Sequence, residues 1–72
     1  MDAFERIDVN DDNVRKKFEL GLYYLDVVND ILYKHENPTD KHVTVINYAN
    51  KIITTISVDA YHQIIYENRQ KI

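Results

Sequence analysis

Residues 52–58 read Ile52-Ile53-Thr54-Thr55-Ile56-Ser57-Val58, and helix and strand signals conflict there. Six of these seven residues are branched at Cβ, which restricts their side chains in a helix and favours a strand. Around this stretch, however, a mostly apolar stripe recurs at helical spacing over about six turns, which predicts a helix. The stripe comprises His42, Val45, Ile46, Ala49, Ile52, Ile53, Ile56, Ala60 and Ile64. We therefore predict a helix over 38–70 and keep a strand at 52–58 as the alternative.

Two signals punctuate this predicted helix. Beyond Ala60 the apolar positions drift to Tyr61 and Ile65, which indicates a bend or a new helix near Ser57, with Ser57 as its cap. At the other end, the segment 37–40 reads Asn-Pro-Thr-Asp. Proline disfavours helix at the residue before it and suits the first position of a new helix, so this segment predicts a break between two helices.

Upstream of that break, the sequence predicts a first long helix over 12–35. The segment 10–13, Asn-Asp-Asp-Asn, offers several N-caps for it. Its apolar residues form two sets on nearly opposite faces. The first set, expected to form the intrachain core, is Phe18, Leu22, Leu25, Val28 and Leu32. The second set is Leu20, Tyr23, Tyr24, Val27 and Ile31. Residues 1–10 are expected to form an arm or a short helix.

The second set predicts a protein interface. A helix that packs against a single neighbour shows one apolar stripe, and two stripes indicate two neighbours. Only one other long helix is predicted in the chain, so the second neighbour is expected to be another copy. The predicted fold is thus all-α, a helical hairpin within a single domain over 1–72, which dimerises into a helical bundle through Leu20, Tyr23, Tyr24, Val27 and Ile31.

The function expected from these features is non-enzymatic. The chain has six tyrosines, a residue type enriched at interfaces, and Tyr48 and Tyr66 fall on the otherwise polar side of the second predicted helix. We interpret them as a partner surface of a small interaction or regulatory protein with an unidentified protein partner. The many Ile, Asn and Tyr residues have AT-rich codons, which is consistent with a phage or plasmid origin.

Charge and composition narrow the alternatives. The net charge is -3, with -4 in residues 1–37 and +1 in residues 38–72, so neither half offers the basic patch that drives nucleic-acid binding. A nucleic-acid-binding hairpin dimer remains the alternative function. There is no Cys, no leader-like segment and no apolar run of about 20 residues, so a cytoplasmic protein without membrane spans is expected.

The sequence predicts no catalytic, cofactor or metal site. Residues 8–19 place Asp, Asn, Asp and Glu at positions 1, 3, 5 and 12 of a calcium-binding loop, but Asn13 stands where that loop needs Gly. His35 and His42 flank the break near Pro38, and zinc would need further ligands there. His62 has no predicted role. Ser57, the only serine, has no His and acid placed to activate it.

Overall fold

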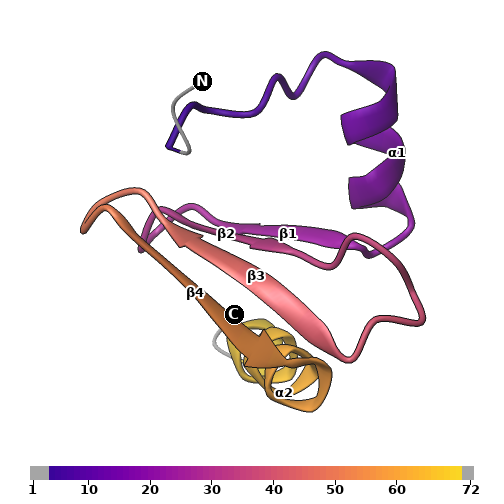
Figure 1. The fold of residues 1–72 in the computed structure, drawn as a ribbon, viewed down its shortest axis with the longest axis vertical. Helices are drawn as coiled ribbons and strands as arrows, with labels where there is room; N and C mark the ends of the chain where they lie inside the picture. The colour runs from indigo at the N-terminus through magenta and orange to yellow at the C-terminus, as the bar shows by residue number, and fades with distance from the viewer. Residues whose placement is uncertain (1–3, 71–72) are drawn as a thin grey trace.

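The protein folds as an antiparallel sheet with helices at both ends of the chain (Figure 1). In the computed structural model, which describes residues 4–70, the helices are α1 (Asp12–Glu19) and α2 (Val58–Gln70). The strands are β1 (Tyr23–Asp26), β2 (Ile31–Lys34), β3 (His42–Asn47) and β4 (Ile52–Ser57). They pair in the order β1-β2-β3-β4, each antiparallel to its neighbour.

The predicted all-α helical hairpin is therefore wrong. The described chain is 31% helical and 30% strand. The helix expected over 12–35 ends at Glu19 and is followed by β1 and β2. The segment expected as a helix over 38–70 contains β3 and β4, and only its last part is helical. The strand alternative for 52–58 is confirmed, because β4 spans Ile52–Ser57.

Local turn chemistry explains why the first helix ends early. Gly21 has a φ of 77°, a left-handed conformation that stops a helix, and its N–H donates to the Phe18 carbonyl at 3.1 Å. Further on, the Asp26 carboxylate accepts hydrogen bonds from the backbone N–H groups of Val28 and Asn29. Asp30 then adopts a φ of 58°. These features build the β1–β2 hairpin inside an apolar pattern that resembled a helical stripe.

The second misread segment has a similar cause. The Asn47 side chain accepts a hydrogen bond from the Asn50 N–H at 3.0 Å, and Lys51 has a φ of 59°. Together they reverse the chain between β3 and β4. Strand β3 packs against apolar groups on both faces, with Val43 and Ile46 buried on opposite sides. A strand buried on both faces loses its polar–apolar alternation, so its residues can fit a helical stripe.

Two boundary predictions are confirmed, and a third is confirmed only in part. Helix α1 begins directly after Asp11, whose carboxylate accepts from the N–H groups of Asn13 and Val14. Helix α2 begins directly after Ser57, whose hydroxyl accepts from the Ala60 N–H at 3.1 Å. The break near Pro38 is real but connects strands, with the Asn37 side chain accepting from the Thr39 N–H in the β2–β3 loop.

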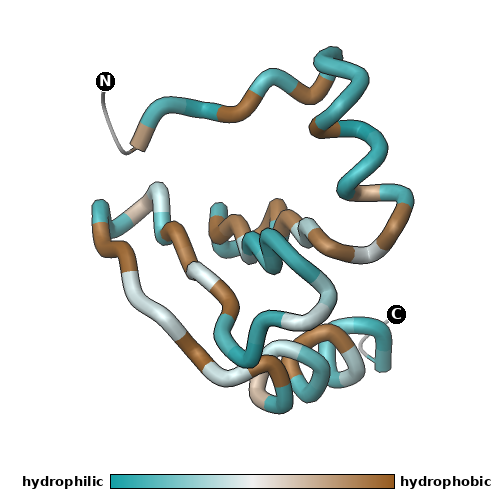
Figure 2. The backbone as a smooth tube through the Cα atoms, turned by 45° about the vertical axis from the view of Figure 1, so that its right-hand side comes forward, coloured by the Kyte–Doolittle hydropathy of each residue, from teal (hydrophilic) through white to brown (hydrophobic). Residues whose placement is uncertain are grey.

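The sheet is covered on both faces, which gives three layers (Figure 1). The N-terminal segment and α1 lie on one side of the sheet and α2 on the other; the hydropathy colouring shows apolar positions in every strand (Figure 2). On the N-terminal side, the buried residues are Leu32, Ile46 and Tyr48, packed against Phe4, Ile7, Phe18 and Leu25. On the α2 side, the buried residues are Tyr33, Val43 and Tyr61, packed mainly against aliphatic side chains.

The path of α2 determines which strands it covers. The Tyr61 ring lies 5.8 Å from the Tyr33 ring of β2, and its hydroxyl donates to the Gly21 carbonyl at 3.3 Å. Near the other end of α2, Asn68 borders the same cleft as the β1–β2 hairpin. The helix therefore starts at the end of β4 and crosses the sheet toward β1. It leaves much of β4 uncovered.

Candidate functional site

The most unusual surface of the molecule is the outer edge of β4. Strand β4 pairs only with β3 and so has one unpaired edge, along its full length of six residues. The opposite edge of the sheet, β1, is shorter at four residues, and none of its residues is exposed. An unpaired edge presents backbone N–H and C=O groups that can bind another strand.

The hydrogen-bond pattern shows which backbone groups face outward. The Val58 N–H donates to the Lys41 carbonyl at 2.9 Å, which fixes the alternation of the β3–β4 ladder. In an antiparallel pair, hydrogen-bonded and non-hydrogen-bonded residue pairs alternate. Residues 52, 54 and 56 therefore direct their backbone groups to β3, and Ile53 and Thr55 direct theirs outward. Within residues 4–70, the hydrogen bonds outside helices and ladders do not involve Ile53 or Thr55.

The faces of β4 are also open. Ile52 is 51% exposed and Ile53 is 43% exposed, and they lie on opposite faces of the sheet. Thr54 and Thr55 are exposed as well. On one face the Tyr61 side chain of α2 packs against Tyr33 and Val43 of the two central strands, and on the other the N-terminal segment packs over Leu32 and Ile46 of the same strands. The result is a strand that is uncovered on its edge and over most of both faces.

The composition of β4 does not protect this edge. Native proteins usually discourage pairing at an exposed edge with charged residues, proline, a bulge or a very short strand. Strand β4 contains no charged residue and no proline, and its register with β3 runs without interruption. Its isoleucines and threonines favour extended backbone. The nearest charges are Lys51, directly before it, and Asp59, in the first turn of α2.

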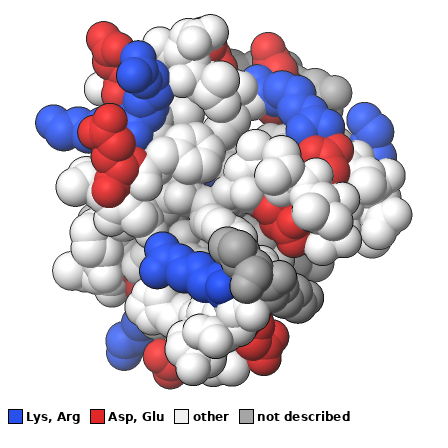
Figure 3. All heavy atoms as spheres, turned by 180° about the vertical axis from the view of Figure 1, so that it is seen from behind, with Lys and Arg blue, Asp and Glu red and all other residues white. Residues whose placement is uncertain are grey.

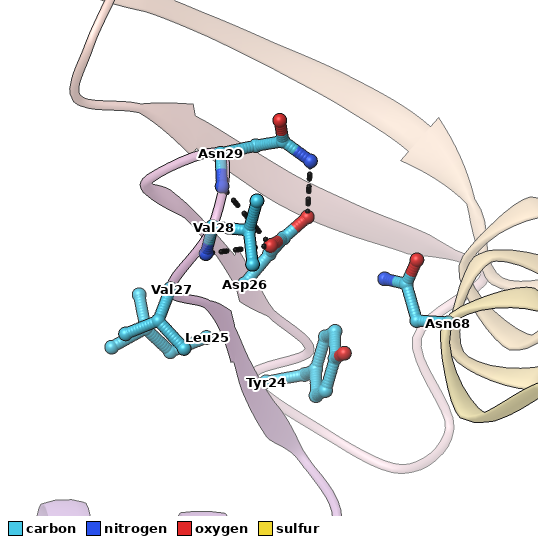
Figure 4. A pocket seen from close by; sticks show the side chains of 7 residues that line it. All are labelled: Tyr24, Leu25, Asp26, Val27, Val28, Asn29 and Asn68. Carbon is cyan, nitrogen blue, oxygen red and sulfur yellow. Dashed lines mark hydrogen bonds between the residues drawn. The ribbon is translucent and has the colours of Figure 1, made fainter. Parts of the chain in front are cut away.

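A second candidate is a cleft of about 310 Å³ between the β1–β2 hairpin and α2 (Figure 4). Tyr24 and Asn68 face one another across it, and Asp26 lies at its base. The Asp26 carboxylate is already engaged by Val28 and Asn29, with the Asn29 amide at 2.9 Å. Because these oxygens stabilise the turn, the cleft has no evident acid or base for chemistry.

Two groups of charged side chains form ion pairs, Arg6 with Asp30 and Lys17 and Lys34 with Glu36. Arg6 contacts Asp30 through two hydrogen bonds of 2.6 and 2.5 Å, which lower the pKa of Asp30. Burial opposes ionisation of Glu36, but hydrogen bonds from Lys17 and Tyr23 outweigh it and lower the pKa of that carboxyl. Viewed from behind, acidic and basic side chains are interspersed with uncharged ones over the face (Figure 3). This face therefore carries no patch of one sign.

The residues predicted as a helical interface do not share a face. Leu20, which is 65% exposed, follows α1, and Val27, which is 80% exposed, lies in the β1–β2 turn. Tyr23 is buried on the N-terminal side of the sheet. Tyr24 and Ile31 are half-buried on the α2 side. The dimer stays a prediction, but the helix face on which its contacts were argued is absent.

The two tyrosines predicted as a partner surface are also separated. Tyr48 is 7% exposed and packs under the Arg6 guanidinium, which lies 4.1 Å from its ring centre. Burial raises the pKa of its hydroxyl, which has no hydrogen-bond partner among the described residues. Tyr66 is exposed on α2. Tyr48 is thus part of the core under the N-terminal segment, whereas Tyr66 is accessible.

The residues weighed as metal ligands have other contacts. Asp8 accepts a hydrogen bond from the Asn10 N–H, and Asp11 caps α1. His35 is buried, with Nε2 at 2.8 Å from the Asp40 carbonyl, and His42 and His62 are exposed. Within residues 4–70, no group of three or more His, Cys, Asp or Glu side chains could hold a metal ion. In the same range, neither helix is long and apolar enough to cross a membrane.

The chain was compared with family models, curated proteins and solved structures. No family model, curated protein or solved structure matches the chain. The geometry of the β4 edge is therefore the main indication of function. Ile53 and Thr55 were not predicted as site residues, although the run of β-branched residues that contains them was the available signal.

Proposed function

We propose that this protein is a non-enzymatic interaction protein that binds another protein chain by accepting a strand along β4. One observation carries the proposal. Strand β4 is an uncharged edge whose outward backbone groups and exposed isoleucines are uncovered. Such an edge supplies main-chain hydrogen bonds for affinity, and the alternating side chains on its two faces supply specificity.

The alternative function, nucleic-acid binding, receives less support. Binding to nucleic acid is driven by lysine and arginine side chains that contact phosphates and displace the counterions condensed on them. Here Arg6 contacts Asp30, and Lys17 and Lys34 lie within 3.4 Å of Glu36. No specific feature of the described residues favours that function, so we propose the protein-binding edge alone.

The proposal is tested by removing one outward donor. Thr55→Pro deletes the N–H that faces a bound strand, and an edge position tolerates proline because that N–H is not used by the sheet. Thr55→Val is the matched control, since it keeps the N–H and the branched shape. Both variants and the wild type are tagged and used for capture from the cells that encode the protein. Each captured protein is then purified, and its binding to the wild type and to the two variants is measured separately.

A strand-binding edge gives a defined set of results. Wild type and Thr55→Val bind the purified partner. In the wild-type complex, binding slows hydrogen exchange at the backbone amides of Ile53 and Thr55. Thr55→Pro binds at least about tenfold more weakly, which corresponds to about 1.4 kcal/mol. Equal binding by all three proteins, with unprotected Ile53 and Thr55 amides in the wild-type complex, would contradict the proposal.

A further inference from the structure

We infer that the strand received by β4 is β4 of a second copy of this chain, in antiparallel pairing about a two-fold axis at Thr54. The inference rests on the proposed function and names the partner. The product is a dimer in which two four-stranded sheets join into one continuous sheet. Three features of the strand favour a second copy: the positions of its free backbone groups, the symmetry of its side chains and the charges at its ends.

The backbone groups limit the register of such a pair. Ile53 and Thr55 direct their N–H and C=O groups outward, so each must lie opposite an outward residue of the partner strand. With Thr54 on the two-fold axis, Ile53 lies opposite the partner's Thr55, and Thr55 lies opposite the partner's Ile53. Each such pair exchanges two hydrogen bonds, so the two pairs form four across the axis.

The side chains of β4 are self-complementary in the same register. On the face toward α2 the strand presents Ile52, Thr54 and Ile56, a pattern that reads the same in both directions. Pairing about Thr54 places Ile52 against the partner's Ile56 at both ends, and the two Thr54 side chains meet at the centre. A slip that centres the axis on Ile53 or Thr55 would pair isoleucine with threonine on this face. The Thr54 register alone matches both isoleucines.

The charges at the ends of the strand are complementary. Lys51 precedes β4 and exposed Asp59 follows it by two residues. An antiparallel arrangement brings Lys51 of each copy opposite the partner's Ser57, near the partner's Asp59. Parallel pairing would instead bring the same charges together. Attraction between opposite charges at the rim fixes the orientation of the partners, even where it adds little affinity.

The rest of the fold leaves room for the partner strand. Helix α2 begins at the end of β4 and extends under the sheet (Figure 1), and its Tyr61 ring lies 5.8 Å from the Tyr33 ring of β2, so the helix covers the inner strands more than the middle of β4. On the other face, the Lys51 ammonium lies 5.5 Å from the centre of the Phe4 ring at the start of the strand, and Ile53 and Thr55 remain exposed. The outer edge of β4 is thus not paired with any other strand of the described chain.

The inference is tested by sedimentation equilibrium over a range of concentration, from about 1 μM to about 1 mM, the span in which modest interfaces dissociate. Wild type and Thr55→Val are expected to dimerise within it, and Thr55→Pro to dimerise at least about tenfold more weakly. Thr54→Lys and Thr54→Asp each place like charges opposite one another on the axis, so each alone should dimerise about fivefold more weakly than wild type. An equimolar mixture of these two variants should recover the lost affinity, because opposite charges then face each other.

Three results would overturn the inference: a wild-type monomer throughout the range, a dimer insensitive to Thr55→Pro, or no recovery on mixing the two Thr54 variants. Circular dichroism of each variant shows whether its fold is intact. These failures differ from a failure of the proposed function. Suppose that the wild type is monomeric but binds a purified protein partner, and that Thr55→Pro does not bind that partner. Then β4 binds a different chain, and the proposed function stands.

Discussion

The structure distinguishes sharply between two residues that the helical interpretation placed in the same core. Val28 and Leu32 are four residues apart, on what was expected to be one helix face. In the sheet, Leu32 is 0% exposed at the centre of β2, whereas Val28 is 91% exposed in the turn before that strand. Truncating each to alanine therefore tests the fold directly, because the sheet predicts unequal effects and the helix predicts comparable ones.

The expected loss for Leu32→Ala follows from its surroundings. Leu32 packs against Ile46 and Tyr48 and lies opposite Leu25 across the β1–β2 pair. These neighbours are fixed by the sheet and cannot fully collapse into the space left by the side chain. A buried leucine truncated in this way costs about 2–5 kcal/mol. A chain of 72 residues has a total unfolding free energy of about 4–11 kcal/mol, so the loss is a large fraction of it.

Urea denaturation followed by circular dichroism measures the effect, at a fixed low protein concentration so that association does not add to stability. Leu32→Ala is expected to lower the unfolding free energy by about 3 kcal/mol and Tm by more than about 10 °C. Val28→Ala is expected to change the unfolding free energy by less than about 0.5 kcal/mol. A Val28→Ala loss as large as that of Leu32→Ala would refute the placement of these residues in the sheet.

Two further predictions concern pH and the start of α2. The pKa of Glu36 is lowered in the folded state, so its ion contributes stability above the ordinary carboxyl pKa, and this is lost as pH falls through the lower folded value. Glu36→Gln should therefore reduce the loss of stability on acidification, and urea titrations at pH 7 and below pH ~4 would show it; an unchanged pH dependence would contradict this role. Ser57→Ala removes the cap of α2 and should lower the free energy of unfolding by about 1 kcal/mol, whereas Ser57→Asp should retain most of it. Thermal unfolding measures both variants, and equal losses would argue against capping.

The sequence predicted several boundaries of the fold but not its class. The segment 10–13 was expected to supply the N-cap of the first helix, and Ser57 that of a helix after it, because a short polar side chain before a helical pattern has one dominant use. Pro38 was identified as a break because it disfavours helix before it. These are local effects, set by a few bonds near each residue, and the structure retains them. Local capping therefore survived an error about the fold as a whole.

Hydrophobic periodicity predicts the wrong fold class here because it takes no account of the turns. The segments 26–30 and 47–51 supply the side-chain caps and positive φ angles of two tight reversals, yet both lie inside apparently continuous stripes. The central strands are buried on both faces, so the alternation that marks a strand is absent there. Long-range pairing decides such segments, and no single window of the sequence contains it. The interface predicted from a helix face lost its geometric basis for the same reason.

The β-branched run at 52–58 connects the fold to the proposed function. Its residues favour a strand, yet α2 and the N-terminal segment together cover mainly the other strands, so β4 keeps exposed isoleucines on both faces. A monomeric protein would be expected to protect such an edge with charge or proline. Here the charges stand just outside the strand, at Lys51 and Asp59, where they do not prevent pairing and are placed to align an antiparallel partner. The unprotected edge is therefore explained more simply as a binding surface than as an exposed remnant of the core.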